Sequence, residues 1–108
     1  MSSDLLGHVK DQVLEVGKDD YVGLWQVLSL VHQAWPSVDD RAARQLTQQI
    51  IKELLDSKSV AAGFPAMRGA GFEPWDGPTE TILARISDEW DRLASEPNIG
   101  EVVWLTAL

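Results

Sequence analysis

The chain contains no cysteine among its 108 residues. This absence excludes disulfide bonds, a thiolate nucleophile and a cysteine-based zinc site, so the fold must depend on the burial of apolar side chains. Histidine is also scarce, because His8 and His32 are the only imidazoles and no His-Glu-x-x-His pattern is present. A zinc ion needs three or four converging ligands, so we expect no metal site, and no motif indicates a cofactor.

Motifs of the common catalytic classes are missing as well. The stretch 69–71 is rich in glycine but lacks the Lys-Ser/Thr pair of a P-loop, and Ser29 with His32 lacks the glycines of a nucleophile elbow. Carboxylates on either side of Pro78 could converge for acid–base chemistry. With 17 acidic residues in the chain, however, solvated carboxylates that cluster by chance are the simpler interpretation. We therefore expect no enzymatic activity.

The sequence also lacks a convincing membrane span. Residues 21–38 carry no charged side chain, but Pro36 interrupts the run. On a helical wheel, Gln26, Ser29 and Gln33 form one polar stripe, which is typical of a largely buried helix in a soluble protein. The first seven residues have neither the basic nor the long apolar region of a secretion signal, so we expect a cytoplasmic protein.

Basic residues are few. Nine Lys and Arg stand against 17 Asp and Glu, which gives a net charge of −8. The excess is greatest in residues 69–108, which hold eight acids and two bases. Such a surface repels nucleic acid phosphates and anionic lipid and accelerates encounter with a basic partner, although a charge of this size also serves solubility alone.

Apolar spacing predicts four helices and two strands. Gly17 follows the first helix as its expected C-cap, and residues 63–78, with four Gly and three Pro, are expected to form a long irregular loop. The expected helices run from Asp4 to Val16, from Tyr21 to Ala34, from Asp39 to Asp56 and from Pro78 to Leu93, and the expected strands cover residues 60–64 and 97–106.

The two strands have only each other as candidate partners, so they are expected to pair as a two-stranded β-ribbon. The sequence therefore predicts a mainly α, α+β fold in which residues 1–108 form a single domain. No internal repeat or linker is present.

Three helices followed by a small β-ribbon resemble the winged-helix arrangement, with the last helix inserted between the two strands. The segment 89–104, together with residues 71–75, also resembles a group of small bacterial proteins of uncharacterised role. The first resemblance implies a winged-helix-like fold, and the second implies no activity.

Aromatic residues and carboxylates lie close together in and after the 63–78 loop. Aromatic anchors among charges are typical of protein interfaces, so we expect a non-catalytic, acidic protein-binding domain with a basic partner, such as an immunity protein or antitoxin that covers a nuclease-like toxin. The alternative is that these aromatics only fold the loop onto the core. The candidate residues are Phe64, Phe72, Glu73, Trp75, Asp76 and Glu80, with Asp88 and Asp91 further along the last helix.

A second hypothesis is a DNA-binding regulator in which residues 21–34 and 39–56 form a helix-turn-helix. The third helix carries residue types that read base edges and phosphates: Arg41, Arg44, Gln45, Gln48 and Lys52. Asp39 and Asp40 at the start of that helix, and the missing basic excess, argue against it. Free edges of a two-stranded ribbon would in addition allow a homodimer.

Overall fold

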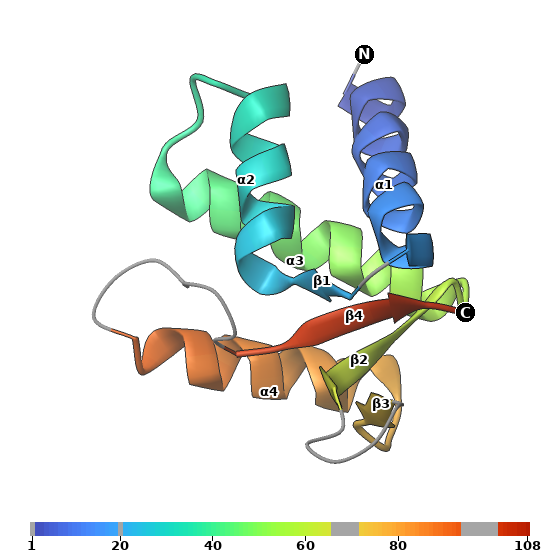
Figure 1. Ribbon diagram of the computed structural model, residues 1–108. Helices are drawn as coiled ribbons and strands as arrows, with labels where there is room; N and C mark the ends of the chain where they lie inside the picture. The colour runs from blue at the N-terminus through green and yellow to red at the C-terminus, as the bar shows by residue number, and fades with distance from the viewer. Residues whose placement is uncertain (1, 20, 66–71, 94–101) are drawn as a thin grey trace.

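Helices form most of the structure, a computed structural model that describes residues 2–19, 21–65, 72–93 and 102–108 (Figure 1). The described part contains four helices and four strands, which confirms the prediction of a mainly helical α+β fold. Their order is α1 (Ser2–Asp19), β1 (Val22–Gly23), α2 (Leu24–Ala34), α3 (Asp40–Asp56), β2 (Val60–Pro65), β3 (Phe72–Pro74), α4 (Thr79–Asp91) and β4 (Trp104–Ala107).

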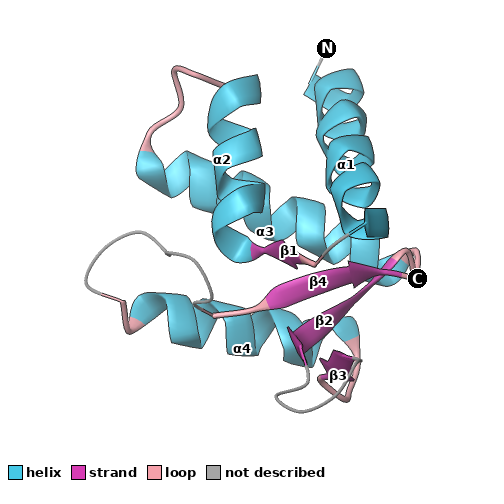
Figure 2. Cartoon of the chain, viewed as in Figure 1, coloured by secondary structure: helices cyan, strands magenta, loops and turns pink. Residues whose placement is uncertain are grey.

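The strands form one antiparallel sheet in the order β1-β4-β2-β3 (Figure 2). The expected pairing of β2 with the last strand is confirmed, with a register that runs from Val60 opposite Ala107 to Gly63 opposite Trp104. β1 pairs with the other side of β4, and β3 pairs with the other side of β2. The last strand in the chain is therefore an inner strand of the sheet.

One hydrophobic core joins all four helices to the sheet. Its side chains occupy the inner faces of the helices and one face of the sheet, as the alternation along strands and the helical period require. Thr47 is buried among them and donates its hydroxyl to the carbonyl of Ala43, 2.8 Å away. Fully buried members include Val9, Val13, Leu24, Val27, Val31, Ile50, Ile51, Ile86, Val103 and Leu105.

Helix α3 begins and ends where its sequence predicts. Asp39 is the N-cap, and its carboxylate accepts a hydrogen bond from a backbone N–H of the first turn at 2.8 Å. At the other end, Lys58 has a φ of 58° and its N–H donates to Leu55, while the N–H of Ser59 donates to Leu54. These two bonds form a Schellman motif, which satisfies the last carbonyls of the helix before β2 begins.

Two of the strands were not expected. Val22 and Gly23 form β1 rather than the start of a helix, because β4 offers them a pairing edge and α2 begins only at Leu24. The expected loop likewise contains β3, which pairs with β2. The expected two-stranded ribbon is thus the central pair of a four-stranded sheet. Its two outer edges are covered, which removes the argument for a homodimer through free ribbon edges.

Two helix boundaries also differ from expectation. Gly17 does not end α1, which continues to Asp19. Instead, Gly17 is buried where α1 passes close to Ala107 of β4, and this packing keeps the helix intact beyond the glycine. Part of the expected strand 97–106 and part of the 63–78 loop lie outside the described residues. Within the described residues, no helix has both the length and the apolar character of a membrane span.

Val102 has an unusual backbone conformation for a β-branched residue, with a φ of 72°. Val103, directly before β4, and Leu105 within it are buried, while Trp104 between them is half-exposed. Regular alternation would turn Val102 outward, yet its side chain is only 7% exposed. The left-handed conformation therefore places two successive valines in the core at a strain cost of about 1 to 3 kcal/mol.

Val102→Gly is expected to leave the protein at least as stable as Val102→Ala. Both variants lose the side-chain methyl groups, but only glycine removes the steric strain of a left-handed backbone. Urea unfolding of both variants measures the difference. At the control position, Val103→Gly should be less stable than Val103→Ala by about 0.5 to 1 kcal/mol, as in an ordinary strand. An alanine variant clearly more stable than the glycine variant at position 102 would contradict the assigned strain.

Candidate functional site

Trp75 lies just after β3, where a glycine in β2 sets its position. A Cβ on Gly63 would overlap the backbone at Glu73, so only glycine lets β3 lie this close to β2. Directly after the strand, the N–H of Trp75 donates to the carbonyl of Ala62 at 2.8 Å. The indole is therefore held against β2 by backbone contacts.

The indole of Trp75 already has two partners inside the protein. The ring of Phe64 meets it edge-on at 5.7 Å, and the guanidinium of Arg85 lies 3.8 Å from its centroid. Arg85 also donates to the carboxylate of Glu89 at 3.0 Å. An arginine over an indole is a cation–π contact, so one face of Trp75 is covered from within.

The three aromatic residues predicted to anchor a partner do not form one cluster. Trp75 packs against the hydrophobic core, whereas the core of the described residues does not include Phe64 or Phe72. Phe72 meets Tyr21 instead, with the ring centroids 5.2 Å apart. This contact joins the two outer strands of the sheet across β4 and β2. For Trp75, the alternative interpretation of an aromatic that folds the loop onto the core has support.

A groove lies beside Trp75, between the start of β2, the end of α3 and the start of α4. Its volume is about 350 Å³, at the lower end of the range for ligand pockets. Most of its lining is apolar, and Leu108, which is 77% exposed, forms part of the rim. This Trp75 groove is lined by Leu55, Lys58, Val60, Ala61, Ala62, Trp75, Gly77, Pro78, Thr79, Ile82 and Leu108.

None of the predicted carboxylates lines this groove, but two of them adjoin its lining in the chain. Asp76 directly precedes the lining segment 77–79, Glu80 directly follows it, and Glu73 belongs to β3. All three are exposed, and none forms an ion pair within the described part of the chain. Asp91 behaves differently, because it is 2.7 Å from the guanidinium of Arg44.

Two of the five residues on the face of α3 that was predicted to read DNA, Arg44 and Gln48, lie toward α4, whereas the other three are exposed. Arg44 donates to both the carbonyl and the hydroxyl of Ser87 at 3.1 Å, pairs with Asp91 and lies 4.9 Å from the ring of Trp90. Its guanidinium is therefore occupied by contacts that hold α3 and α4 together. Arg41, about one turn before Arg44, and Gln45, directly after it, are exposed.

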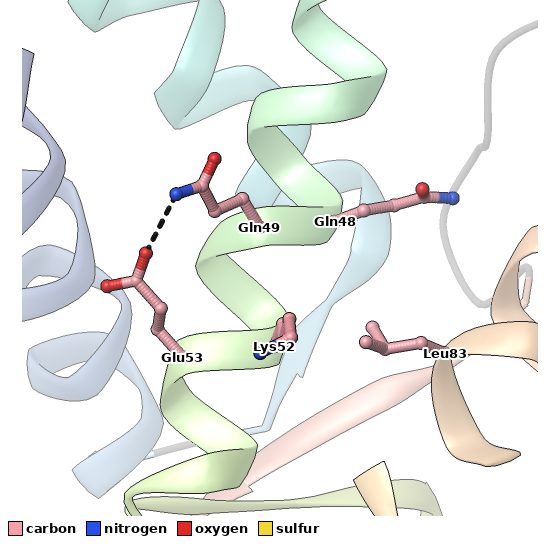
Figure 3. A pocket seen from close by; sticks show the side chains of 5 residues that line it. All are labelled: Gln48, Gln49, Lys52, Glu53 and Leu83. Carbon is pink, nitrogen blue, oxygen red and sulfur yellow. Dashed lines mark hydrogen bonds between the residues drawn. The ribbon is translucent and has the colours of Figure 1, made fainter. Parts of the chain in front are cut away.

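Further along α3, another polar side chain also lies near α4. Gln48 and Leu83 reach from α3 and α4 toward a shared hollow of about 440 Å³, whereas Gln49 and Glu53 turn away from α4 (Figure 3). The Nε2 atom of Gln48 is buried and has no hydrogen-bond partner among the described residues. Lys52 pairs with Asp56 at 2.8 Å and remains exposed.

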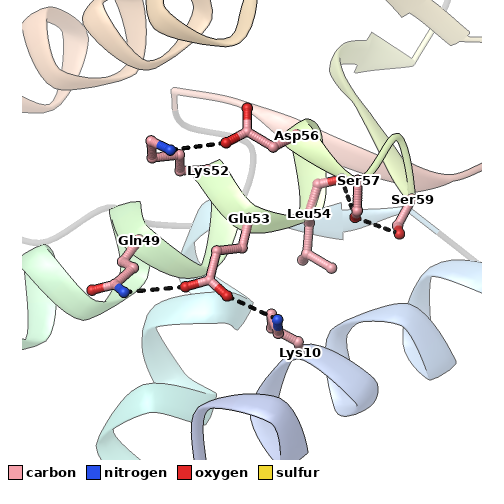
Figure 4. A network of polar contacts seen from close by, with 8 residues as sticks. All are labelled: Lys10, Gln49, Lys52, Glu53, Leu54, Asp56, Ser57 and Ser59. Atoms are coloured by element: carbon pink, nitrogen blue, oxygen red, sulfur yellow. Dashed lines mark hydrogen bonds and ion pairs between the residues drawn. The ribbon is translucent and has the colours of Figure 1, made fainter. Parts of the chain in front are cut away.

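A polar network at the C-terminal half of α3 connects this helix to α1 (Figure 4). Lys10 donates to Glu53 at 2.9 Å, and Gln49 donates to the other oxygen of the same carboxylate at 3.1 Å. The hydrogen bond from Lys10 lowers the pKa of Glu53, and the bond from Gln49 lowers it further. Both bonds favour the charged carboxylate.

The pair of Lys52 and Asp56 shows the same effect at the surface. The hydrogen bond from Lys52 lowers the pKa of Asp56, and a bond from Thr79 of α4 adds to it. The same bond to Asp56 raises the pKa of Lys52. Both side chains belong to α3 and are exposed, so this i,i+4 pair contributes little to stability.

The structure brings together residues that the sequence did not connect. Arg85 over Trp75 and the groove-lining Ala61, Ala62 and Leu108 were not predicted, because no spacing in the sequence links them. Only the pairing of Arg85 with Glu89 has a sequence signal, the i,i+4 spacing on α4. No group of three His, Asp or Glu in the described residues is arranged to hold a metal ion.

Trp75→Ala is expected to lower the free energy of unfolding by about 2 to 4 kcal/mol, because it removes a large side chain that packs on the core. Phe72→Ala should cost less, since Phe72 is outside the core cluster. Thermal and urea unfolding of both variants measure the difference. Equal and small losses would instead support Trp75 as a pure surface anchor.

Lys10→Met is expected to destabilise the protein at neutral pH, and this loss should shrink in acid. The folded-state pKa of Glu53 is lowered, so its stabilising contribution is full above its unfolded pKa of about 4.3 and is lost as the pH falls through the folded-state value. Urea unfolding from neutral pH to about pH 3 follows the change. Lys18→Met is the matched control on α1, because its partner Glu15 is largely exposed. A loss that stays constant with pH would contradict this assignment.

Comparison of the chain with models of protein families, with curated proteins and with solved structures finds no match. The winged-helix resemblance, which depended on element order, therefore stays a prediction. Function has to be argued from the site itself: a small apolar groove beside Trp75 with exposed carboxylates next to its lining in the chain, and a polar face of α3 on which Arg44 and Gln48 lie toward α4.

Proposed function

We propose that the protein is a non-catalytic, acidic protein-binding domain that recognises a basic protein partner in the cytoplasm, as an immunity protein or antitoxin does. The observation that carries this proposal is the set of exposed carboxylates beside the Trp75 groove. Glu73, Asp76 and Glu80 are all exposed. Within the described residues, Glu73 and Asp76 form no ion pair, and Glu80 has only a longer-range Coulombic interaction with Lys52.

The overall charge supports the same conclusion. A net charge of −8 on 108 residues attracts a basic protein over a distance of about one Debye length, roughly 10 Å, and raises the rate of association. Exposed charges at the rim of an interface contribute modestly to affinity, so tight binding needs an apolar contact as well. The groove beside the carboxylates offers such a contact.

The DNA-binding alternative has less support. Arg44 is bound to α4 and Lys52 is paired with Asp56, which leaves Arg41 as the exposed arginine of the predicted set. Asp39 and Asp40 stand at the start of α3, where a recognition helix would approach the phosphates. Non-specific affinity for DNA depends on several free cations, and a gel-shift titration at low salt should show no binding.

Affinity purification with the full chain tests the proposed function. The immobilised protein is expected to retain a basic protein from an extract of its own cells, and salt should release that protein because the attraction is electrostatic. Neutralising the three carboxylates by Glu73→Gln, Asp76→Asn and Glu80→Gln should weaken retention. A triple variant elsewhere, Asp11→Asn, Glu15→Gln and Asp40→Asn, changes the net charge equally and should retain the partner. Specific retention of an acidic partner, or equal loss in both variants, would contradict the proposal.

A further inference from the structure

The Trp75 groove has a mostly apolar lining and adjoins two exposed carboxylates in the chain, Asp76 and Glu80. Its inner wall is formed by small side chains of β2, Ala61 and Ala62, and Ile82 of α4 lies at its base. Leu108 is 77% exposed at the rim, the largest exposed fraction among the large hydrophobic residues described. A groove of about 350 Å³ has room for one large apolar side chain and for part of the segment that presents it.

The charged residues near the groove indicate which kind of residue should flank a side chain bound there. Asp76 and Glu80 bracket the lining segment 77–79, and Glu73 lies on the neighbouring strand. Lys58 is the one cation in the lining, and the nearby Arg85 is held by Glu89 and by the indole of Trp75. Glu80 also has a Coulombic interaction with Lys52, which is paired with Asp56. The carboxylates near the groove still outnumber the nearby cations, which favours a positively charged occupant.

From these observations we infer that the Trp75 groove binds a single large aliphatic side chain of the basic partner, presented in a segment where lysine or arginine flanks it on both sides. This inference rests on the proposed function and names the part of the partner that the site recognises. A second copy of this chain is a poorer occupant, because it would bring a net charge of −8 against the same carboxylates.

A short synthetic peptide tests this inference directly. The probe is the acetylated and amidated pentapeptide Lys-Arg-Leu-Arg-Lys, titrated into the full chain at low salt. Nitrogen-15 chemical shifts of the Trp75 indole and of the Ala61 and Ala62 amides report on the groove and yield a dissociation constant. Replacing the central leucine by alanine should weaken binding about tenfold, since most of the buried apolar area is lost. The peptide Glu-Glu-Leu-Glu-Glu should not bind.

Variants of the protein separate the apolar contact from the charge. Leu108→Ala should weaken binding of the leucine peptide more than that of the alanine peptide, and its exposure means that the fold is kept. Val16→Ala, at the 39% exposed Val16 of α1, is the matched control and should have no effect. Asp76→Asn with Glu80→Gln should weaken both basic peptides about two- to fivefold, while Asp11→Asn with Glu15→Gln should not.

The outcomes distinguish this inference from the proposed function. Equal binding of the leucine and alanine peptides, lost on neutralising Asp76 and Glu80, would overturn the groove as an anchor site and leave an acidic binding surface. Absence of any shift in the groove at millimolar leucine peptide would also overturn it, whether or not a basic partner is retained in the affinity experiment. Shifts at Tyr21 and Phe72 in place of Trp75 would move the site to the outer face of the sheet and so overturn it too.

Discussion

The pairing of β4 with β1 and β2 joins segments that lie far apart in the chain, and the rest of the structure depends on it. β4 provides a hydrogen-bonding edge on both sides, so β1 exists as a strand only because β4 is present. The N–H of Leu24 at the start of α2 donates to Val103, and Ala107 lies against Gly17 near the end of α1. β4 thus connects directly to α1 and α2, and it connects to α3 through β2. These contacts hold the helices and the sheet around one core.

Because α4 packs antiparallel to α3, several polar residues of α3 have a different role from the one that the sequence suggests. Contacts run in order along the two helices, with Arg44 beside Ser87 and Asp91, Gln48 near Leu83, and Asp56 bonded to Thr79. Two residues of the stripe that the sequence suggested as a base-reading face, Arg44 and Gln48, are interhelical contacts. Of its cations, Arg44 is paired with Asp91 of α4 and Lys52 with Asp56 of α3 itself.

Much of the fold could be predicted from the sequence, and the site only in part. Periodicity and caps located α3 and α4, and turn residues around Val60 located β2, because these signals are local. The strand at Val22 and Gly23 could not be predicted, since two residues carry no period and become a strand only through β4. The candidate carboxylates were found because they are close in sequence. The groove was not, because its lining comes from three elements and the chain end, and the spacing of residues says nothing about which of them meet.

Gly63 contacts strands on both sides, Trp104 on β4 and Pro74 on β3, and any side chain there would collide with the β3 backbone. The same crowding sets the distance at which Trp75 stands from β2, and so the width of the apolar hollow. One missing Cβ therefore serves both the pairing of β3 and the hollow beside Trp75. A side chain at position 63 would disturb the two together, so neither can be altered at this point of the sheet without the other.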